Sequence, residues 1–447
     1  MYRHTGMYYP DMNRKKVLII TYYWPPASGP GVFRFLKISR YLREFGWEPV
    51  ILTVKNGSYP AIDPALQKNI PEGIKVYKTL TVEPFALFNL LTGKKGKALP
   101  VAMIPDKRHD GLLKRLLFYI RANFFIPDAR KGWIFFARRK ALRIIRDEQI
   151  EAIITTGPPH STHLIGLTLK THCRLPWIAD LRDPWVNIYY NSMFPRSAKT
   201  QKKDQLLEDK VISTADMVTV VSHGMKKEFG NRAKKIDIIF NGFDDIDIVE
   251  KKMEVTEKFI LAYVGNFKPQ QNIPMLWQAI AELKETTPRF EKLFTLTLTG
   301  NVDVSVQKTI KRYGLEALVR CLPFVSHHEA VKYMVDANAL LFVISNIVNN
   351  EYIITGKLFE YLASRTPVLS IGPPGGDASA ILQEAGRDAM CGYDEKEKFK
   401  QRLMQHFNWW LENDQQCKIE KESNILQYSR KKLTEKLSMH LYDLCNQ

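Results

Sequence analysis

Short apolar runs alternate with amphipathic segments along this chain. The stretch from Lys15 to Pro26, "KKVLIITYYWPP", is apolar, rich in β-branched residues and closed by Pro-Pro, which is typical of a buried parallel strand. In the next segment Phe35, Ile38, Leu42 and Phe45 recur at helical spacing before a glycine. The strand-like run "EPVILTV" follows. This order predicts one βαβ unit with a glycine-containing loop between its first strand and its helix.

The alternation continues through two series, separated by the charged segment "KKMEVTE" at 251–257. Strands alternating with helices twice over predict an α/β fold with two doubly wound, Rossmann-like domains. We expect an irregular segment at 1–16, a first domain at 17–250 and a second domain at 257–425. A final helix at 426–447 could pack back on the first domain. The tail from Lys396 to Leu444 is expected to be helical throughout.

Ligands of open parallel sheets sit at the carboxyl ends of the strands, so two such domains facing each other would form a cleft. The loops expected to line it are 27–33, 157–163, 182–185, 241–244, 265–271 and 347–356.

Polar residues in the first three of these loops are candidates for a binding site. Gly29 and Gly31 would let a ligand approach the backbone at a helix N-terminus, although a plain tight turn explains them equally well. "GPPHSTH" and "ADLRDPW" place His160, Arg182 and Asp183 at strand ends, where an Asp–Arg pair could also simply fix a loop. His160 and His163 have no third ligand at a fixed spacing, so zinc is not indicated.

Composition limits the functional class. The 447 residues carry a formal net charge of +18, which favours an anionic partner. The five cysteines are scattered without a CxxC pair, which indicates a reducing compartment. No run reaches the roughly 18 apolar residues of a membrane span. These features predict a cytoplasmic protein. A short DxD pattern at Asp245 and Asp247 is too common to indicate a metal.

The segment 111–146 is the most basic part of the chain. It contains ten Lys or Arg residues, one acid (Asp128) and seven aromatic residues. Basic residues among aromatic ones suit an anionic membrane surface, and nucleic acid could use the same composition. Two helices with buried apolar faces would also explain it. All three interpretations stay open from composition alone.

Taken together, the motifs resemble bacterial family 4 (group 1) glycosyltransferases of the GT-B fold, of the polysaccharide-biosynthesis type. The resemblance begins at "YYWPPASGPGVFRFLKISRYLREFGWEPVILT" and continues through "TGPPHSTHLIG", "PWIADLRDPW", "ADMVTVVS", "FNGFD" and "YVGNF" to "TGKLFEYLASRTPVLSIGPPGGDAS". It covers nearly the whole chain. It implies a metal-independent enzyme without a cofactor that transfers a sugar from a nucleotide-diphosphate sugar to a glycan or lipid-linked acceptor. Retention of configuration, cell-surface polysaccharide synthesis and contact with the inner face of the plasma membrane through 111–146 are also implied.

The resemblance implies roles for particular residues. Glu360 would bind the ribose hydroxyls, and Lys357 would lie near the phosphates or the leaving group, beside a helix N-terminus that attracts the diphosphate. The donor-binding set is Gly265, Asn266, Lys268, Val325, Thr355, Gly356, Lys357, Leu358 and Glu360. The catalytic set is His160, Asp183 and Lys357, and the acceptor-side set is Gly29, Gly31, Arg34 and Arg182.

Three positions depart from the family pattern. Tyr352 stands where the family has a second glutamate, with Glu351 one place away, and Asn266 and Gln271 stand where it has two cations. Lys268 could substitute for one of them. These departures keep a second hypothesis open, a non-catalytic GT-B-like protein that binds a nucleotide or glycan. A nucleic-acid-binding protein is suggested by charge alone, and no nucleic acid is expected as a partner.

Overall fold

The computed structural model describes residues 14–83, 112–188, 191, 193–245, 254–420 and 425–447. The chain forms two compact units: Met1–Phe240 with Arg430–Gln447, and Asn241–Ser429. Most of the irregular segment expected at 1–16, and Ile246–Asp247 of the DxD pattern, lie outside the described residues.

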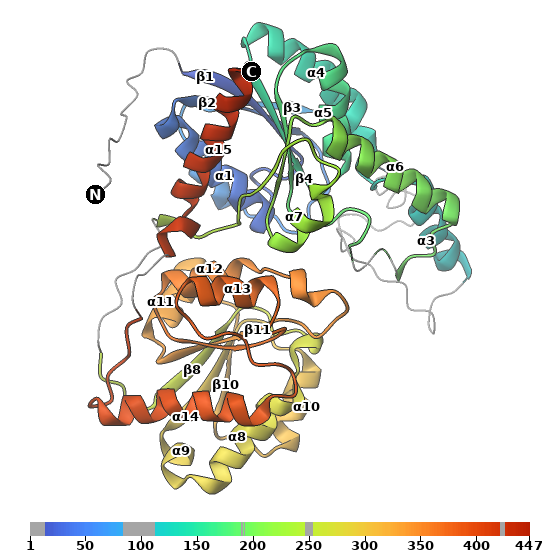
Figure 1. Ribbon diagram of the computed structural model, residues 1–447. Coiled ribbons are helices and arrows are strands. Elements are labelled where there is room, and N and C mark those ends of the chain that lie inside the picture. Colours follow the sequence, from blue (N-terminus) through green and yellow to red (C-terminus); the bar gives the residue numbers. More distant parts are fainter. Residues whose placement is uncertain (1–13, 84–111, 189–190, 192, 246–253, 421–424) are drawn as a thin grey trace. The chain divides into compact units, whose positions relative to one another are not determined.

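The first unit is built on a seven-stranded parallel sheet of order β3-β2-β1-β4-β5-β6-β7 (Figure 1). The order reverses between β1 and β4, which places a topological switch point at the carboxyl ends of these two strands. The strands are β1 (Lys15–Thr21), β2 (Trp47–Val54), β3 (Lys75–Thr79), β4 (Ala152–Gly157), β5 (Trp177–Leu181), β6 (Met217–Val220) and β7 (Ile236–Ile238). The helices are α1 (Pro30–Leu42), α3 (Leu112–Phe124), α4 (Ile134–Asp147), α5 (Ser161–His172), α6 (Ala198–Thr214), α7 (His223–Gly230) and α15 (Arg430–Cys445).

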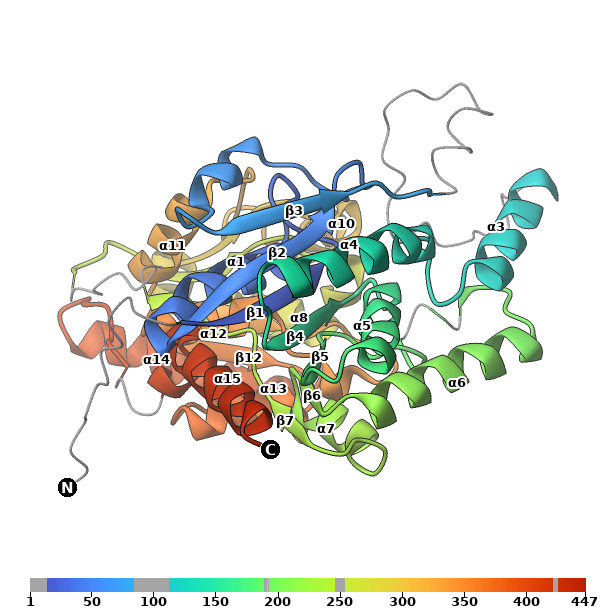
Figure 2. The same cartoon turned by 90° about the horizontal axis from the view of Figure 1, so that it is seen from above.

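Each face of this sheet has its own apolar layer, because successive strand residues point to opposite faces. Leu18 and Ile20 pack in one core with residues of α4, α5, α6 and α7. Val17 and Ile19 pack in the other with residues of α1 and α15. Figure 2 shows α4 and α5 on the opposite side of the sheet from α15. The C-terminal helix is therefore part of the first unit's core, although it follows the second unit in sequence.

The second unit has a five-stranded parallel sheet of order β10-β9-β8-β11-β12. Its strands are β8 (Phe259–Val264), β9 (Phe294–Thr299), β10 (Val319–Leu322), β11 (Ala339–Val343) and β12 (Val368–Ile371). Its helices are α8 (Pro274–Thr286), α9 (Pro288–Leu293), α10 (Val304–Arg312), α11 (His327–Asp336), α12 (Gly356–Ala363), α13 (Asp377–Glu384) and α14 (Lys396–Glu412). Short 3₁₀ turns lie at Arg43–Phe45, Pro64–Asn69, Lys131–Trp133, Pro269–Gln271, Asn350–Tyr352 and Ile425–Tyr428.

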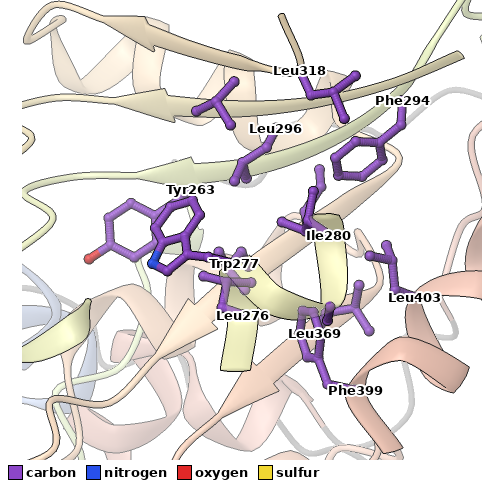
Figure 3. Close-up of a cluster of buried hydrophobic side chains, with 14 of the residues drawn as sticks. Tyr263, Leu276, Trp277, Ile280, Phe294, Leu296, Leu318, Leu369, Phe399 and Leu403 are labelled. Carbon is purple, nitrogen blue, oxygen red and sulfur yellow. The ribbon is translucent and has the colours of Figure 1, made fainter. Parts of the chain in front are cut away.

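An apolar core supports one face of this second sheet. Figure 3 shows Leu296, Phe294 and Tyr263 from the strands against Trp277 and Ile280 of α8. Tyr263 lies at the edge of the cluster, and its hydroxyl oxygen points away from the other labelled side chains (Figure 3).

The predicted α/β class is confirmed by these two parallel sheets. The prediction of a tail that is helical throughout is wrong. Helix α14 ends at Glu412, and the described residues 413–420 are not helical. Asp414 and Gln415 have positive φ angles of 52° and 59°, and Gln416 forms an isolated bridge with Val255. These local conformations end the helix at Glu412, so α14 and α15 are separate helices.

Candidate functional site

Arg182 joins three loops at the carboxyl edge of the first sheet. Its Nε and Nη2 donate to the carbonyls of Gly157, the last residue of β4, and of Pro158, at 3.1 and 2.7 Å. A Cβ atom on Gly31, at the start of α1, would lie 1.7 Å from Arg182 Nη1. Position 31 must therefore be glycine if the Arg182 guanidinium is to lie at the N-terminus of α1.

His160 lies beside this cation, directly before α5. Its ring stacks on Trp185, with the centroids 4.9 Å apart and the planes 9° apart, and the His163 ring is 6.0 Å away. Burial, His163 and Arg182 lower the pKa of His160 well below its ordinary value. The imidazole is therefore neutral at pH 7, and a neutral ring can accept a hydrogen bond as well as donate one.

His163 lies behind His160 and has a fixed orientation. Its Nδ1 is 2.9 Å from Thr155 Oγ1, which also accepts a hydrogen bond from Trp177 Nε1. Burial, with Arg182 adding to it, lowers the pKa of His163 to about 3. A Cβ on Gly157 would come within 2.5 Å of His163 Nε2, so this ring also depends on a glycine.

Asp183 follows Arg182 in the same loop. Burial raises the pKa of its carboxyl group, and the Arg182 charge opposes that effect. Within the first unit, the structure thus brings together Gly31, His160, Arg182 and Asp183. Gly29, with a φ of 133°, precedes α1 and accepts backbone hydrogen bonds from Val32 and Phe33.

Arg34 occupies a different environment, underneath these loops. Only 2% of it is exposed, and its Nη2 donates to Asp180 Oδ1 at 2.8 Å. Its two Nη atoms also donate to the Phe240 and Ile239 carbonyls. The other Asp180 oxygen accepts from Thr156. Arg34 therefore ties α1 to β5 and to the segment that follows β7.

Sequence reasoning missed several residues of this edge. The Asp128 carboxylate accepts hydrogen bonds from the backbone N–H and the hydroxyl of Ser161, both at the first residue of α5. Arg130 is buried and lies over the ring of Tyr22. In the sequence, only the Pro-Asp pair within the basic segment 111–146 indicated a turn at this place, and that segment was interpreted from its charge. Trp185 belongs to the motif "ADLRDPW", but the sequence does not show that its ring stacks on His160.

In the second unit, Lys357 lies across the loop that follows β8. Its Nζ is 2.6 Å from the Tyr263 hydroxyl and 4.2 Å from the centroid of that ring. A Cβ on Gly265 would lie 2.5 Å from Lys357 Cε. Gly265 has a φ of 117°, which L side chains rarely adopt. This glycine is therefore required both by its backbone angle and by the lysine that crosses it.

The environment of Lys357 disfavours its charge. Burial, with Lys268 adding to it, lowers the pKa of Lys357 to about 8, and Glu360 opposes the shift. Gly356 and Lys357 are the first two residues of α12, and Thr355 precedes the helix. An anion bound at this helix N-terminus would stabilise the charged form of the lysine.

The other predicted donor residues lie in different surroundings. Glu360 is half-buried, one turn into α12, and Val325 is half-buried in the loop before α11. Leu358 is fully buried in the core. Asn266 and Lys268 are both exposed, so their side chains are open to solvent at the loop after β8.

Gln271 and Tyr352 account for two departures from the family pattern. Gln271 is buried: its Oε1 accepts from the Lys268 backbone at 3.0 Å and its Nε2 donates to the Val343 carbonyl at 2.7 Å. It thus ties the loop after β8 to the end of β11. Tyr352 is 44% exposed in a 3₁₀ turn. Within the described residues, His, Cys, Asp and Glu side chains form no group of three that could hold a metal ion.

Comparisons with known proteins agree with this architecture. Residues 244–432 match the family described as "Glycosyl transferases group 1". No curated protein sequence matches the chain. Among solved structures, sucrose-phosphate synthase from Thermosynechococcus elongatus is 14% identical with a TM-score of 0.53, and each chain is covered to 97%. A TarM variant from S. aureus, in complex with fondaparinux, α-GlcNAc-glycerol and UDP, is 11% identical with a TM-score of 0.56; 97% of this chain and 100% of that chain are covered.

The same fold also carries other chemistry. A UDP-N-acetylglucosamine 2-epimerase from Listeria monocytogenes is 11% identical with a TM-score of 0.54, over 96% of this chain and 97% of that chain. Fold alone therefore does not select the reaction. The family match narrows the choice, because residues 244–432 match the model of the group 1 glycosyl transferases. The chain has the same two-unit α/β fold as these solved structures, and the family match over residues 244–432 agrees with the resemblance found in the motifs of that part of the chain.

Proposed function

We propose that the protein transfers a sugar from a nucleotide-diphosphate sugar to a glycan, and that the donor binds at the N-terminus of α12. The observation that carries this proposal is the joint placement of Gly265, Lys357 and Glu360 in a group 1 glycosyl transferase domain. Backbone N–H groups and an ammonium suit the diphosphate, and a carboxylate can accept hydrogen bonds from both ribose hydroxyls.

In the proposed reaction, the bond from the anomeric carbon to the diphosphate oxygen breaks while the acceptor hydroxyl oxygen bonds to that carbon on the same face. The hydroxyl proton passes to the departing phosphate oxygen, so configuration is retained. Lys357 and the α12 N-terminus stabilise the charge that develops on the diphosphate, and no metal or cofactor takes part. His160, Arg182 and Asp183 are the residues proposed to bind the acceptor.

Thermal stabilisation by nucleotides tests the donor site. A ligand at about 100 times its dissociation constant adds roughly 2.7 kcal/mol to the free energy of unfolding. We expect one class of nucleoside diphosphate or nucleotide sugar to raise the Tm of the wild type and not of Glu360→Ala. Glu291→Ala, an exposed glutamate of α9, is the matched control and should respond like the wild type. If no nucleotide stabilises the folded wild type, the non-catalytic alternative replaces this proposal.

We further propose that the acceptor is a lipid-linked glycan of cell-surface polysaccharide synthesis, and that α3 holds the enzyme at the inner face of the plasma membrane. Leu116, Tyr119, Ile120 and Phe124 lie on one face of α3, with exposed fractions of 54%, 46%, 36% and 64%. In α4, by contrast, Ala137, Ala141 and Ile144 are buried. No helix among the described residues is long and apolar enough to cross a membrane.

Charge favours an anionic lipid surface as the partner of α3. The segment 111–146 has ten basic residues and one acid, and Arg121 and Lys131 lie over aromatic rings next to the exposed helix. A surface that combines exposed apolar residues with cations is typical of helices that lie in the membrane interface.

Vesicle flotation tests this contact. The wild type should bind phosphatidylcholine vesicles that contain phosphatidylglycerol, and Leu116→Asp with Phe124→Asp should lose at least about tenfold in affinity, because two apolar contacts are replaced by charges that anionic lipid repels. Val304→Asp, at an exposed apolar position of the second unit, is the control. Equal binding by the double variant and the wild type would contradict the role of α3.

A further inference from the structure

Tyr263 connects Lys357 to the framework of the second unit. The residue belongs to β8 and is 1% exposed, and its ring packs at 4.6 Å from Phe267 in the apolar core. Its hydroxyl is the part that leaves the core (Figure 3). A rigid strand residue thus presents one polar atom to the loop that follows the strand.

The Tyr263 hydroxyl is shared between the lysine and the loop. It accepts from Lys357 Nζ at 2.6 Å. It lies within donating distance of the Asn266 carbonyl, at 2.9 Å, and of Gln271 Oε1, at 3.1 Å. Because a hydroxyl has one proton and two lone pairs, these contacts leave the lysine as a donor to it.

We propose that Tyr263 is a positioning residue that holds the Lys357 ammonium over Gly265, at the N-terminus of α12. Its hydroxyl fixes the direction of the ammonium, its ring face adds a cation–π contact, and Gln271 anchors the hydroxyl to the loop. The consequence for sugar transfer rests on the proposed function, whereas the contact itself does not.

The physical reason is that an unrestrained lysine side chain has four rotatable bonds, so its ammonium would move among many solvated positions. Because Tyr263 holds the lysine, its ammonium already lies in a partly buried position, and little rearrangement is needed when a diphosphate binds. The charged groups that face it are Lys268, from the loop after β8, and Glu360, from its own helix. Gln271, which stands where the family has a cation, then serves this framework instead of contacting the ligand directly.

Competitive labelling with acetic anhydride over a pH series tests the contact without any nucleotide. Mass spectrometry then gives the labelling of each lysine at each pH. Lys357 should be labelled with a midpoint near pH 8, the pKa that its burial gives it. In Tyr263→Phe the ring remains, but the ammonium loses its acceptor, so we expect the midpoint to move to lower pH. Lys292, an exposed lysine of α9, is the internal control and should be labelled alike in both proteins.

Tyr361→Phe distinguishes positioning from structural support. The Tyr361 hydroxyl accepts from the Val264 backbone N–H at 2.9 Å, so its loss perturbs the same strand. We expect it to leave the Lys357 midpoint unchanged. Tyr263→Phe should in addition lower kcat by about tenfold or more, with a smaller change in KM.

Two results would overturn the proposal: a Lys357 midpoint in the wild type equal to that of Lys292, or one that Tyr263→Phe does not change. A shift to higher pH would support it, since it would mean that the ammonium had left its buried place. If the midpoint shifts as expected but no nucleotide binds the wild type, the positioning stands and the proposed function fails.

Discussion

Two glycines in this protein are defined by the cations beside them. Gly31 gives space to Arg182, and Gly265 to Lys357, with the hypothetical Cβ at 1.7 Å from Nη1 and 2.5 Å from Cε respectively. Each glycine follows a strand in the sequence and leaves space for a side chain from a distant segment of the chain. At the residue scale, each candidate site thus requires a glycine, which has no side chain, as much as it requires the charged residue beside it.

Gly31→Ala tests this dependence in the first unit. We expect the methyl group to displace the Arg182 guanidinium and to lower transferase activity by roughly tenfold, while the fold tolerates alanine in a helix. Gly230→Ala, at the end of α7, is the matched control, because nothing lies within 4 Å of its Cβ. Equal activity of both variants would show that the place of Arg182 does not matter.

The pH dependence of nucleotide binding tests Lys357. Its pKa is lowered to about 8, so the ammonium loses its proton as the pH rises through 8. We expect affinity for UDP, measured by calorimetry, to weaken across pH 7–9.5, and Lys357→Met to bind more weakly with a flatter profile. An identical slope in Lys357→Met would assign the titration to another group.

The same shift affects stability in the opposite direction. A lysine whose folded pKa lies below its ordinary value of 10.5 destabilises the fold below about pH 8. This cost is relieved as the pH rises from about 8 towards 10.5, because the unfolded chain then binds more protons than the folded one. Without ligand, the contribution of Lys357 to stability therefore improves over the range in which nucleotide binding weakens.

At the element scale, α15 is a helix that belongs to a sheet far from it in sequence. Leu433, Leu437 and Leu441 join the core formed by α1 and one face of the first sheet. The Tyr442 hydroxyl donates to the Phe45 carbonyl, just after α1. This helix thus covers strands that lie some four hundred residues before it.

Leu437→Ala should lower the free energy of unfolding by about 2–5 kcal/mol, since it removes a side chain that is 2% exposed and leaves a cavity. Met439→Ala in the same helix, at a position 55% exposed, should change it by at most about 0.5 kcal/mol. Urea denaturation checks both. A small effect at Leu437 would mean that α15 does not contribute to the core.

For the whole molecule, the relevant fact is that each unit has its own apolar cores. The chain passes from one unit to the other after Phe240 and returns after Ser429. We therefore expect calorimetry to resolve two transitions. UDP should raise only the one assigned to Asn241–Ser429, and Leu437→Ala should lower only the other. A single transition that both changes shift would mean that the units unfold together.

The sequence predicted much of this fold because parallel strands buried on both faces are continuous apolar runs. Lys15–Thr21 and Phe259–Val264 are such runs, and both are strands. The order of motifs also indicated the family that residues 244–432 match. The tail was harder to predict, because no glycine or proline marks the positive φ angles at Asp414 and Gln415, where the backbone leaves the helix.

The candidate site was only partly visible in the sequence. A glycine-containing loop before a helix indicated Gly31, and the resemblance to the family indicated Gly265, Lys357 and Glu360. Tyr263 gave no signal, since an aromatic residue in an apolar strand is usually core, and only the direction of its hydroxyl distinguishes it. Arg34 and Arg182 have the same chemistry in the sequence. Their different surroundings, one enclosed with Asp180 and one facing Gly31, depend on which strands lie side by side.

By itself, the sequence determined the class of fold and the succession of strands and helices, and it indicated the glycosyltransferase family that residues 244–432 match. These depend on local periodicity and on motifs in order. Only the tertiary structure decided that α15 covers the first sheet, that α3 exposes its apolar face while α4 buries its own, and that Tyr263 holds Lys357. Those features depend on contacts between segments distant in the chain. Local periodicity predicts whether a residue is buried, but it does not predict which residue it contacts.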